Sequence, residues 1–465
     1  MNFYLGLDFG TSGARYAVID ASGTLRAEGK YTWQDGTPSP SEWQKALFAL
    51  IGDIPQEMRG QMGAIALDGT SATVLLCDSD GNPRSEPLLY NDGRGVEVME
   101  KVRAIAPDNH PVISATSSFA KLLWLQENYK LENNRLLAQI ETGQSLWTET
   151  PPIFNKIDRP NALPLHLSKR SNFQDRTYYF LHQADWLGFL LHGKLGISDY
   201  HNALKLGYDV GELSYPEWLT KALDCSTDTI TIKLPEVVVP GTSVGKVAPG
   251  IAKRFGLPPD CRVKAGTTDS IAAFLASGAD SPGEAVTSLG STLVLKLLSR
   301  DRLDDARYGI YSHRLGDLWL TGGASNTGGA VLKAYFNDEE LEKLSGEIDP
   351  EKESLLDYYP LLKKGDRFPI NDPDLPPKLD PKPENAAEFL NGLLEGIARI
   401  EGRGYNLLQQ LGATPLKRVY TAGGGAKNPT WTAIRHRYLK VPVEESLNTE
   451  AAYGAAILAM KGINN

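Results

Sequence analysis

The chain has 465 residues, a length that predicts two large domains or about three of ordinary size. A hydrophobic share of 41% excludes disordered and fibrous proteins, and a net charge of −9 without a long basic cluster predicts no nucleic-acid partner. The apolar runs fall far short of the roughly 18 residues that span a bilayer, so we expect no membrane segment. Three scattered cysteines and the lack of a signal-peptide pattern predict a cytoplasmic chain, with a plastid-like compartment as the alternative.

The first part of the chain predicts an antiparallel meander followed by a helix and a fourth strand. Short apolar runs alternate with glycine-rich turns, and the helical segment has apolar residues on one face. The predicted elements are strands at 3–8, at 16–19 and from 24, a helix at 41–51, and a strand at 64–67. Strands that lead into helices indicate an α/β chain.

The segment 131–177 differs from its surroundings. It contains four prolines and many Asn and Ser residues, and it has no sustained hydrophobic period. We therefore expect a surface excursion or a long loop there, whose role the sequence leaves open. Regular patterning resumes with a helix at 183–191, a strand at 262–265 and a helix at 270–276.

The second half of the chain repeats the plan of the first. A strand at 285–288 runs into the turn 290–292 and a second strand at 294–298, as the strand at 3–8 runs into the turn 10–13. This repeat predicts a duplicated α/β domain with a cleft between its halves. The later predicted elements are strands at 309–313, 318–321 and 418–421, and helices at 329–336, 386–411 and 428–438.

The turn after the first strand is a candidate phosphate site. Asp8 precedes Gly10, Thr11, Ser12 and Gly13, so a carboxylate stands beside backbone N–H groups and two hydroxyls. Such a turn can bind an anion and a hydrated Mg²⁺, although a tight hairpin alone also uses glycine.

Two further turns extend this prediction. Gly290, Ser291 and Thr292 form the matching turn of the second half, and two such turns facing across a cleft could grip one polyphosphate. The glycines at 423–425, between a strand and a helix, would let a flat ring or a ribose approach the backbone, with a flexible connection as the alternative.

Asp269 has two possible roles in the sequence. It follows a strand and begins a helix, where aspartate is commonly an N-cap. A carboxylate at the C-terminal edge of a strand, facing a cleft, is also placed to accept a proton from an attacking hydroxyl.

Together these residues resemble the FGGY carbohydrate kinases, which share a superfamily with hexokinase, actin and the heat-shock chaperone ATPases. A signature of that family is present, with Thr116 as a mismatch where the family normally has Met, Phe, Tyr, Gly or Ser. Its other residues are Ser118, Lys121, Leu122, Trp124, Leu125, Glu127 and Asn128. The resemblance implies a duplicated ribonuclease H-like fold of two lobes with a central cleft, at 1–276 and 277–449, with 450–465 packing back on the first lobe.

The resemblance also implies a mechanism and its residues. It implies Mg²⁺- and ATP-dependent phosphoryl transfer to a sugar hydroxyl, with Asp269 as the base and Asp8 orienting the metal and the acceptor. Asp68 and Ser71 match the turn that contacts the sugar. The implied ATP-binding residues are Gly10, Thr11, Ser12, Gly290, Ser291, Thr292, Gly424, Gly425, Asn428 and Trp431.

Five runs of the chain are similar to the cyanobacterial and plant D-ribulose kinase group. These runs are 5–15, 65–77, 200–208, 265–279 and 285–298. The expected substrate is therefore a ketopentose that is phosphorylated at its terminal hydroxyl, with D-ribulose as the leading candidate. The alternatives are a D-xylulose kinase and an actin-like regulator or slow ATPase that lacks sugar transfer, and the oligomeric state is left open.

Overall fold

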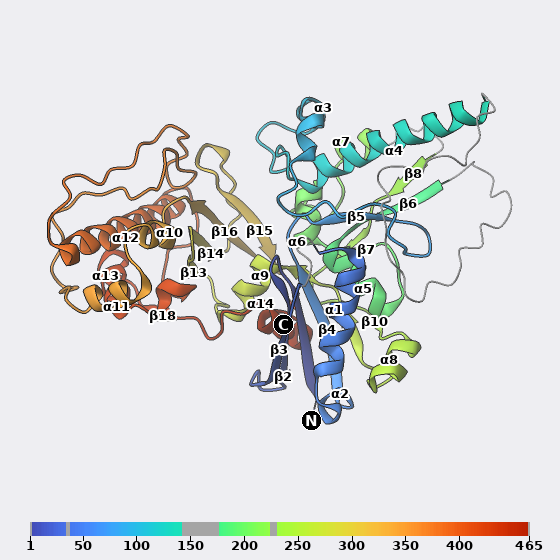
Figure 1. Cartoon of the computed structure of the whole chain (residues 1–465), viewed down its shortest axis with the longest axis horizontal. Helices are drawn as coiled ribbons and strands as arrows, with labels where there is room; N and C mark the ends of the chain where they lie inside the picture. The colour runs from blue at the N-terminus through green and yellow to red at the C-terminus, as the bar shows by residue number, and fades with distance from the viewer. Residues whose placement is uncertain (1, 34–37, 142–175, 224–229, 464–465) are drawn as a thin grey trace. The chain divides into compact units, whose positions relative to one another are not determined.

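The computed structural model describes residues 2–33, 38–141, 176–223 and 230–463 (Figure 1). The chain divides into two compact units, Met1–Asp269 and Ser270–Asn465, which we call unit 1 and unit 2. Both units contain a mixed β-sheet with helices packed on it, as the α/β prediction requires.

The main sheet of unit 1 contains the predicted meander. Its first three strands are antiparallel neighbours, and β4 pairs in parallel with the other side of β1. The strand order is β10-β11-β4-β1-β2-β3, with β12 also pairing with β4. The bounds are β1 (Phe3–Phe9), β2 (Gly13–Asp20), β3 (Leu25–Thr32), β4 (Met62–Gly69), β10 (Ser243–Lys246), β11 (Arg262–Lys264) and β12 (Thr267–Thr268).

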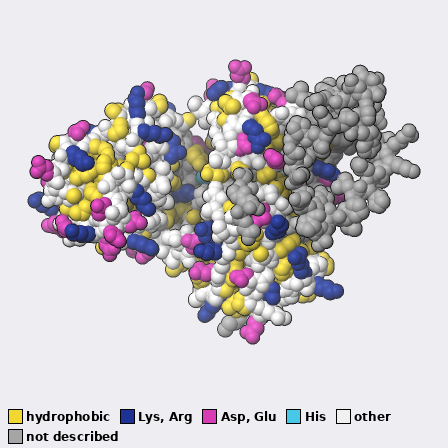
Figure 2. All heavy atoms as spheres, in the orientation of Figure 1, with side chains coloured by type: hydrophobic (Ala, Val, Ile, Leu, Met, Phe, Trp, Pro, Cys, Tyr) yellow, Lys and Arg dark blue, Asp and Glu magenta, His cyan; other side chains and the backbone are white. Residues whose placement is uncertain are grey.

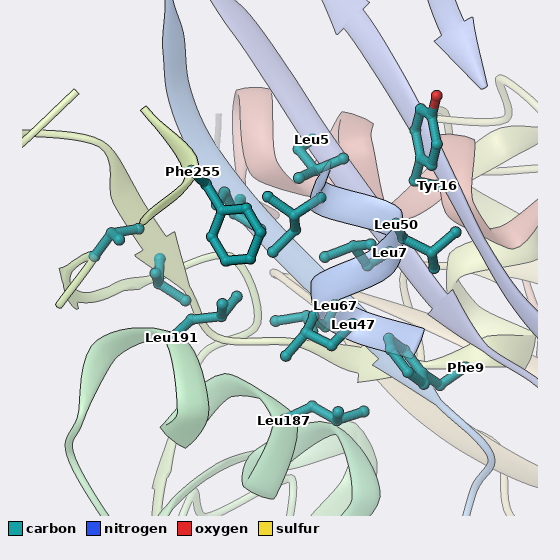
Figure 3. Packing of buried hydrophobic residues seen from close by; sticks show 14 of the residues in the cluster. Leu5, Leu7, Phe9, Tyr16, Leu47, Leu50, Leu67, Leu187, Leu191 and Phe255 are labelled. Carbon is teal, nitrogen blue, oxygen red and sulfur yellow. The ribbon is translucent and has the colours of Figure 1, made fainter. Parts of the chain in front are cut away.

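The core of unit 1 fixes the position of β1 and β4. Helix α1 (Pro40–Asp53) begins after Ser39, whose hydroxyl accepts the N–H of Glu42 as an N-cap. Figure 3 shows its residues Leu47 and Leu50 beside the apolar side chains of β1 and those of α5 (Gln183–His192). Burying each such leucine contributes roughly 1.5–3 kcal/mol to the stability of the fold. This packing therefore holds β1 and β4 in place.

The remaining elements of unit 1 surround this sheet or form two smaller sheets, β5-β6-β8 and β7-β9. They are α2 (Gln56–Arg59), β5 (Val74–Cys77), η1 (Arg94–Val98), α3 (Met99–Ile105), α4 (Ser118–Glu141), β6 (Arg176–His182), β7 (Ile197–Asp199), α6 (Tyr200–Ala203), η2 (Leu204–Leu206), α7 (Glu217–Leu223), β8 (Ile230–Lys233), β9 (Glu236–Val238) and α8 (Pro249–Phe255).

The prediction of a loop over 131–177 is wrong at both ends. Helix α4 continues to Glu141, and β6 begins at Arg176. The first of these differences has a simple reason: 131–141 is rich in Leu, Glu, Gln and Ala, which readily extend a helix that has already started. The rest of the predicted excursion, 142–175, lies outside the described residues.

Unit 2 contains the second mixed sheet, in the order β15-β16-β14-β13-β17-β18. The long helix α12 (Ala386–Gln410) buries its apolar face in the core of this unit, where Leu393, Leu394 and Ile397 are fully buried. The strands are β13 (Glu284–Leu289), β14 (Leu293–Ser299), β15 (Tyr311–Leu315), β16 (Leu318–Ser325), β17 (Arg418–Ala422) and β18 (Val443–Glu445). The other elements are α9 (Asp269–Ala276), η3 (Ala306–Tyr308), α10 (Gly329–Lys333), α11 (Asp338–Ser345), η4 (Gly424–Lys427), α13 (Pro429–Leu439) and α14 (Ala451–Lys461).

The predicted duplication is present in the strand orders. In unit 1 the order β3-β2-β1-β4-β11 has an antiparallel meander followed by two parallel strands, and in unit 2 the order β16-β14-β13-β17-β18 has the same directions. The boundary between the compact units falls before Ser270 rather than after 276. Helix α9 packs closely against α14, where Gly454 lies against the backbone of Ala272, and α14 groups with unit 2 together with the residues of α9 that follow Asp269.

Two surface properties bear on the sequence predictions. Among the described residues, no helix is both long and apolar enough to cross a membrane. Figure 2 shows basic and acidic side chains interspersed over the visible described surface of each unit.

Candidate functional site

The candidate acceptor site of unit 1 lies where parallel strands end. Asp8 of β1 pairs with Asp68 of β4, and Asp68 pairs in turn with Thr267 of β12. Residues paired directly across neighbouring strands project from the same face of a sheet, so the two carboxyl groups are neighbours. Both are buried, with Asp8 5% and Asp68 0% exposed.

Asp269 completes a cluster of three carboxyl groups. It is the first residue of α9, directly after Thr268, which pairs with Gly69 of β4. Its charge acts on Asp68, whose pKa it helps to raise. The structure therefore brings together three of the predicted residues, from sequence positions about 60 and 200 residues apart, because β1, β4 and β12 are adjacent in one sheet.

Asp68 is the member of this cluster whose protonated form is favoured. Burial, the largest effect, and then the charge of Asp8 raise its pKa well above the ordinary value of 3.8. Neither Asp68 oxygen has a donor among the described residues, and an ionised Asp8 is also an acceptor. A hydrogen bond between the two carboxyl groups therefore requires a proton on one of them, and the raised pKa assigns it to Asp68.

Other buried polar atoms around β12 lack a hydrogen-bond partner among the described residues. They are Oγ1 of Thr268 and Oδ1 of Asn202, although the Asn202 amide donates to Asp199 Oδ2 and to the Thr267 carbonyl. Buried polar groups are nearly always satisfied in native proteins. A cluster of such atoms beside acidic groups fits a site that a polyhydroxylated ligand would complete.

The sequence analysis missed Lys205, a half-buried residue of η2. Burial lowers the pKa of this lysine, whereas the carboxylate of Asp269 raises it. A cation thus lies beside the expected base, where it favours the ionised carboxylate. Lysine in a short polar-apolar segment gives no local pattern that could have revealed this contact.

The predicted sugar-contacting turn is held by a second residue that the sequence analysis missed, Gln183 at the start of α5. Its Oε1 accepts the Thr70 N–H at 3.0 Å and the Thr70 hydroxyl at 3.1 Å, and its own N–H donates to the Thr73 carbonyl at 3.0 Å. Gly69 packs against the same side chain. Ser71, the predicted sugar contact, is half-buried within this fixed turn.

The turn between β1 and β2 is a hairpin in which part of the predicted anion site is already used. The Gly10 N–H donates to the Gly13 carbonyl at 3.0 Å. Thr11 and Ser12 are exposed, so they are the residues of this turn that remain accessible to a phosphate.

Unit 2 brings its glycine-rich turns together. Gly423 lies against the carbonyl of Leu289 and the nitrogen of Gly290, and Gly425 packs on Leu289 and Trp431. A third glycine turn, at 328–329, was not singled out by the sequence analysis, although two glycines between a strand and a helix could have signalled it. Its Gly329 N–H donates to the Gly290 carbonyl at 2.8 Å.

Two predicted nucleotide-contacting residues also have structural roles. Asn428 caps α13 through its Oδ1, which accepts the Trp431 N–H at 3.0 Å, and its amide donates to the Ser345 hydroxyl at 2.8 Å. Trp431 is 1% exposed and donates to the Leu394 carbonyl, so it supports Gly425 from beneath.

The acidic cluster contains carboxylate oxygens, the ligands that Mg²⁺ prefers, but it offers few of them to a metal ion. Within the described part of the chain, no group of three or more His, Cys, Asp or Glu side chains is arranged to hold a metal ion. Mg²⁺ commonly keeps several waters and takes only one or two carboxylates together with substrate phosphates, so the single nearly buried Asp8 fits that mode.

Comparisons with known proteins show which families and folds the chain is similar to. Residues 285–463 match the C-terminal domain of the FGGY family of carbohydrate kinases. The xylulose kinase of Bacillus subtilis is 24% identical over 99% of this chain and 88% of its own length, and that of Escherichia coli is 22% identical over 92% and 83%.

Solved structures share the fold at low identity. A xyloylose kinase from Brucella ovis superposes with a TM-score of 0.77 at 21% identity, covering 99% of this chain and 90% of that one. A Plasmodium falciparum glycerol kinase with ADP gives 0.74 at 17% identity, covering 99% and 89%.

The fold is therefore the two-domain, ribonuclease H-like α/β fold of sugar kinases. Over residues 285–463 the chain is similar to the FGGY family of carbohydrate kinases, and over nearly its whole length it is similar to relatives named xylulose kinase.

Proposed function

We propose that this chain is a sugar kinase of the FGGY type, which transfers the terminal phosphoryl group of Mg²⁺-ATP to the terminal hydroxyl of a ketopentose, with D-ribulose as the first candidate. The observation that carries the proposal is the cluster of Asp8, Asp68 and Asp269 at the ends of adjacent strands, beside buried polar atoms without partners. Sugar hydroxyls are both donors and acceptors, so they can satisfy such atoms.

Asp269 is the proposed proton acceptor. It is half-buried, whereas Asp68 is fully buried and its raised pKa favours the protonated form. Lys205 favours the ionised form of Asp269, which is the form that can take a proton from the attacking hydroxyl. Because phosphoryl transfer needs little covalent help from the protein, alignment of that hydroxyl and charge neutralisation are the main tasks.

The nucleotide is proposed to bind the glycine turns of unit 2. The bare backbone at Gly424, where nothing lies within 4 Å of an added Cβ, leaves room for a ring or ribose. A bound Mg²⁺ would supply neutralisation of phosphate charge, and Asp8 is the residue proposed to orient it through water. The proposed reaction requires that the bound sugar hydroxyl reach the terminal phosphoryl group of the bound nucleotide.

Two ketopentoses compete as the acceptor. Relatives named xylulose kinase support D-xylulose, whereas the similarity of five runs to the D-ribulose kinase group supports D-ribulose. The two sugars differ in configuration at C3, so a polar group beside that hydroxyl must discriminate them. Asp68 and Ser71 are the residues proposed to do so.

The test is ADP release from Mg²⁺-ATP, measured with D-ribulose, D-xylulose, L-ribulose, glycerol or no sugar. Strong stimulation by one ketopentose supports the proposal and selects the substrate. Equal slow release in every reaction would contradict sugar transfer and favour a slow ATPase.

A further inference from the structure

The turn that carries Asp68 and Ser71 is tied to a buried lysine on a different element. Lys121 lies on α4, and its side chain is 0% exposed. Its Nζ donates to the Ala72 carbonyl at 2.7 Å and to the Leu89 carbonyl at 2.6 Å. A lysine is almost never fully buried unless its ammonium group has specific partners. The two carbonyls are those partners, and the question is why this position uses a lysine to bind them.

Ala72 is the least relaxed residue of this turn. Its φ is 62°, in the left-handed region that disfavours residues with a Cβ, and the turn closes with the Thr73 N–H on the Thr70 carbonyl. A backbone in that conformation persists only where its surroundings over-determine it. The bond from Lys121 to the Ala72 carbonyl supplies part of that constraint.

The second carbonyl links the turn to the neighbouring segment. Val74, two residues after Ala72, exchanges backbone hydrogen bonds with Leu88, the residue before Leu89. Lys121 therefore bridges two chain segments just beyond the point where they pair. Gln183 holds the turn through Thr70 and Thr73, so the turn is fixed from two sides.

The two carbonyls suit lysine in either protonation state. The pKa of Lys121 is lowered to about 7, chiefly by burial; Asp92 opposes this lowering, whereas Lys205 and Arg94 add to it. A neutral amine still has two N–H donors for two acceptors. The link therefore persists across neutral pH, and the informative measurement is substrate affinity rather than a pH profile.

We propose that Lys121 is a positioning residue of the acceptor site: by holding the Ala72 carbonyl it fixes the turn that presents Asp68 and Ser71 to the sugar. The inference rests on the proposed function. It assigns to Lys121 a selective effect on sugar binding, because its two contacts lie in unit 1 and none involves the glycine turns of unit 2.

The experiment compares Lys121→Met with Lys101→Met in the full chain. Lys101 is the matched control because it is a lysine that contacts α4, where its Nζ lies 3.1 Å from Glu127 Oε1, but its side chain is 41% exposed. For Lys121→Met we expect the sugar KM to rise by about tenfold or more while the nucleotide KM stays within about twofold of wild type. Lys101→Met should leave both constants unchanged.

Three results would overturn the proposal. A folded Lys121→Met with an unaltered sugar KM would show that the turn keeps its shape without the lysine. A parallel rise in both KM values, or a loss of kcat alone, would indicate a general structural role. If no sugar stimulates the wild-type enzyme, the proposed function fails and this inference fails with it.

A second variant guards against failure to fold. Lys121→Gln retains one N–H₂ group near the carbonyls, and circular dichroism establishes whether each variant is folded. We expect a smaller but still sugar-selective rise in KM for this variant. An unchanged sugar KM in folded Lys121→Gln, when Lys121→Met does not fold, would likewise overturn the proposal.

Discussion

The two units share one strand order, but the residues at the ends of their corresponding strands differ in charge. In unit 1 Asp8 stands two residues before Gly10 and pairs with Asp68. In unit 2 Ser288 stands two residues before Gly290 and pairs with Ala422. The same pair of positions is therefore doubly acidic in one unit and neutral in the other.

This difference fits the proposed roles of the two units in phosphoryl transfer. Carboxylates suit the side that must orient and deprotonate a hydroxyl, but they would repel a polyphosphate. Neutral residues and glycines suit the side proposed to hold the nucleotide. Because the strand order is shared, the charge at the strand ends is the difference on which the proposed binding roles of the two units rest.

The largest expected effect tests the acidic side. Asp269→Asn removes the proton acceptor while keeping the shape, so we expect sugar phosphorylation to fall by about 10²–10⁴-fold. Nucleotide affinity should be retained, because Asp269 belongs to unit 1. Coupled ADP release and nucleotide titration measure the two quantities.

Asp260→Asn is the control for this variant, since Asp260 is an exposed aspartate of the same unit. Near-normal turnover in Asp269→Asn would mean that Asp269 is a structural residue of the helix terminus and that the base lies elsewhere.

The second prediction concerns a buried ion pair of unit 2. Glu401 of α12 is fully buried and accepts two hydrogen bonds from Arg435, at 2.6 and 2.8 Å, and one from Thr287 of β13. Glu401→Gln leaves the Arg435 charge buried without its partner, which typically costs about 3–5 kcal/mol. Denaturant unfolding should detect this loss.

The exposed ion pair between Asp374 and Lys364 provides the contrast. Asp374→Asn should change the free energy of unfolding by less than about 1 kcal/mol. Equal effects of the two substitutions would mean that the buried pair contributes no more than a surface one.

The third prediction separates packing from nucleotide binding in the glycine turn. An added Cβ at Gly425 would lie 2.7 Å from both Leu289 and Trp431, so Gly425→Ala should destabilise the chain by about 1–3 kcal/mol. At Gly424 nothing lies within 4 Å, so Gly424→Ala should leave the melting temperature unchanged.

The nucleotide KM distinguishes the two substitutions further. If the nucleotide approaches the bare backbone, Gly424→Ala raises this KM without affecting stability. An unaffected nucleotide KM in both variants would remove this turn from the proposed nucleotide site.

The features that the sequence predicted well are local ones. The hairpin after Asp8 and its counterpart after Ser288 follow from short apolar runs and glycines that are adjacent in the chain. The loop predicted from 131 overlaps the end of helix α4, because the Asn and Ser content of 131–177 favours a loop while the helix-forming residues up to Glu141 continue the helix.

Contacts between distant segments could not be predicted in this way. Gln183 reaches Thr70 across 113 residues, and Lys205 faces Asp269 from η2. These pairs depend on how β4, β12 and α5 come together, which hydrophobic periodicity does not specify. The acidic site was therefore predictable as separate strand ends, but its supporting residues were not.

The smallest expected effect is a pH dependence that only the acidic strand ends possess. The pKa of Asp68 is raised well above 3.8, so the folded protein keeps a proton that the unfolded chain releases above that pH. The unfolding free energy therefore falls as pH rises from about 4 toward the folded pKa, by at most about 1.4 kcal/mol per pH unit.

Asp68→Asn holds hydrogens at the same position and has no proton to lose, so between pH 5 and pH 6 it should lose less stability than wild type. Denaturant titrations at both pH values measure this, with Asp260→Asn as the control, and identical slopes for wild type and Asp68→Asn would contradict the protonated pair. Unit 2 has no counterpart of this dependence at the matching positions, since neither Ser288 nor Ala422 titrates.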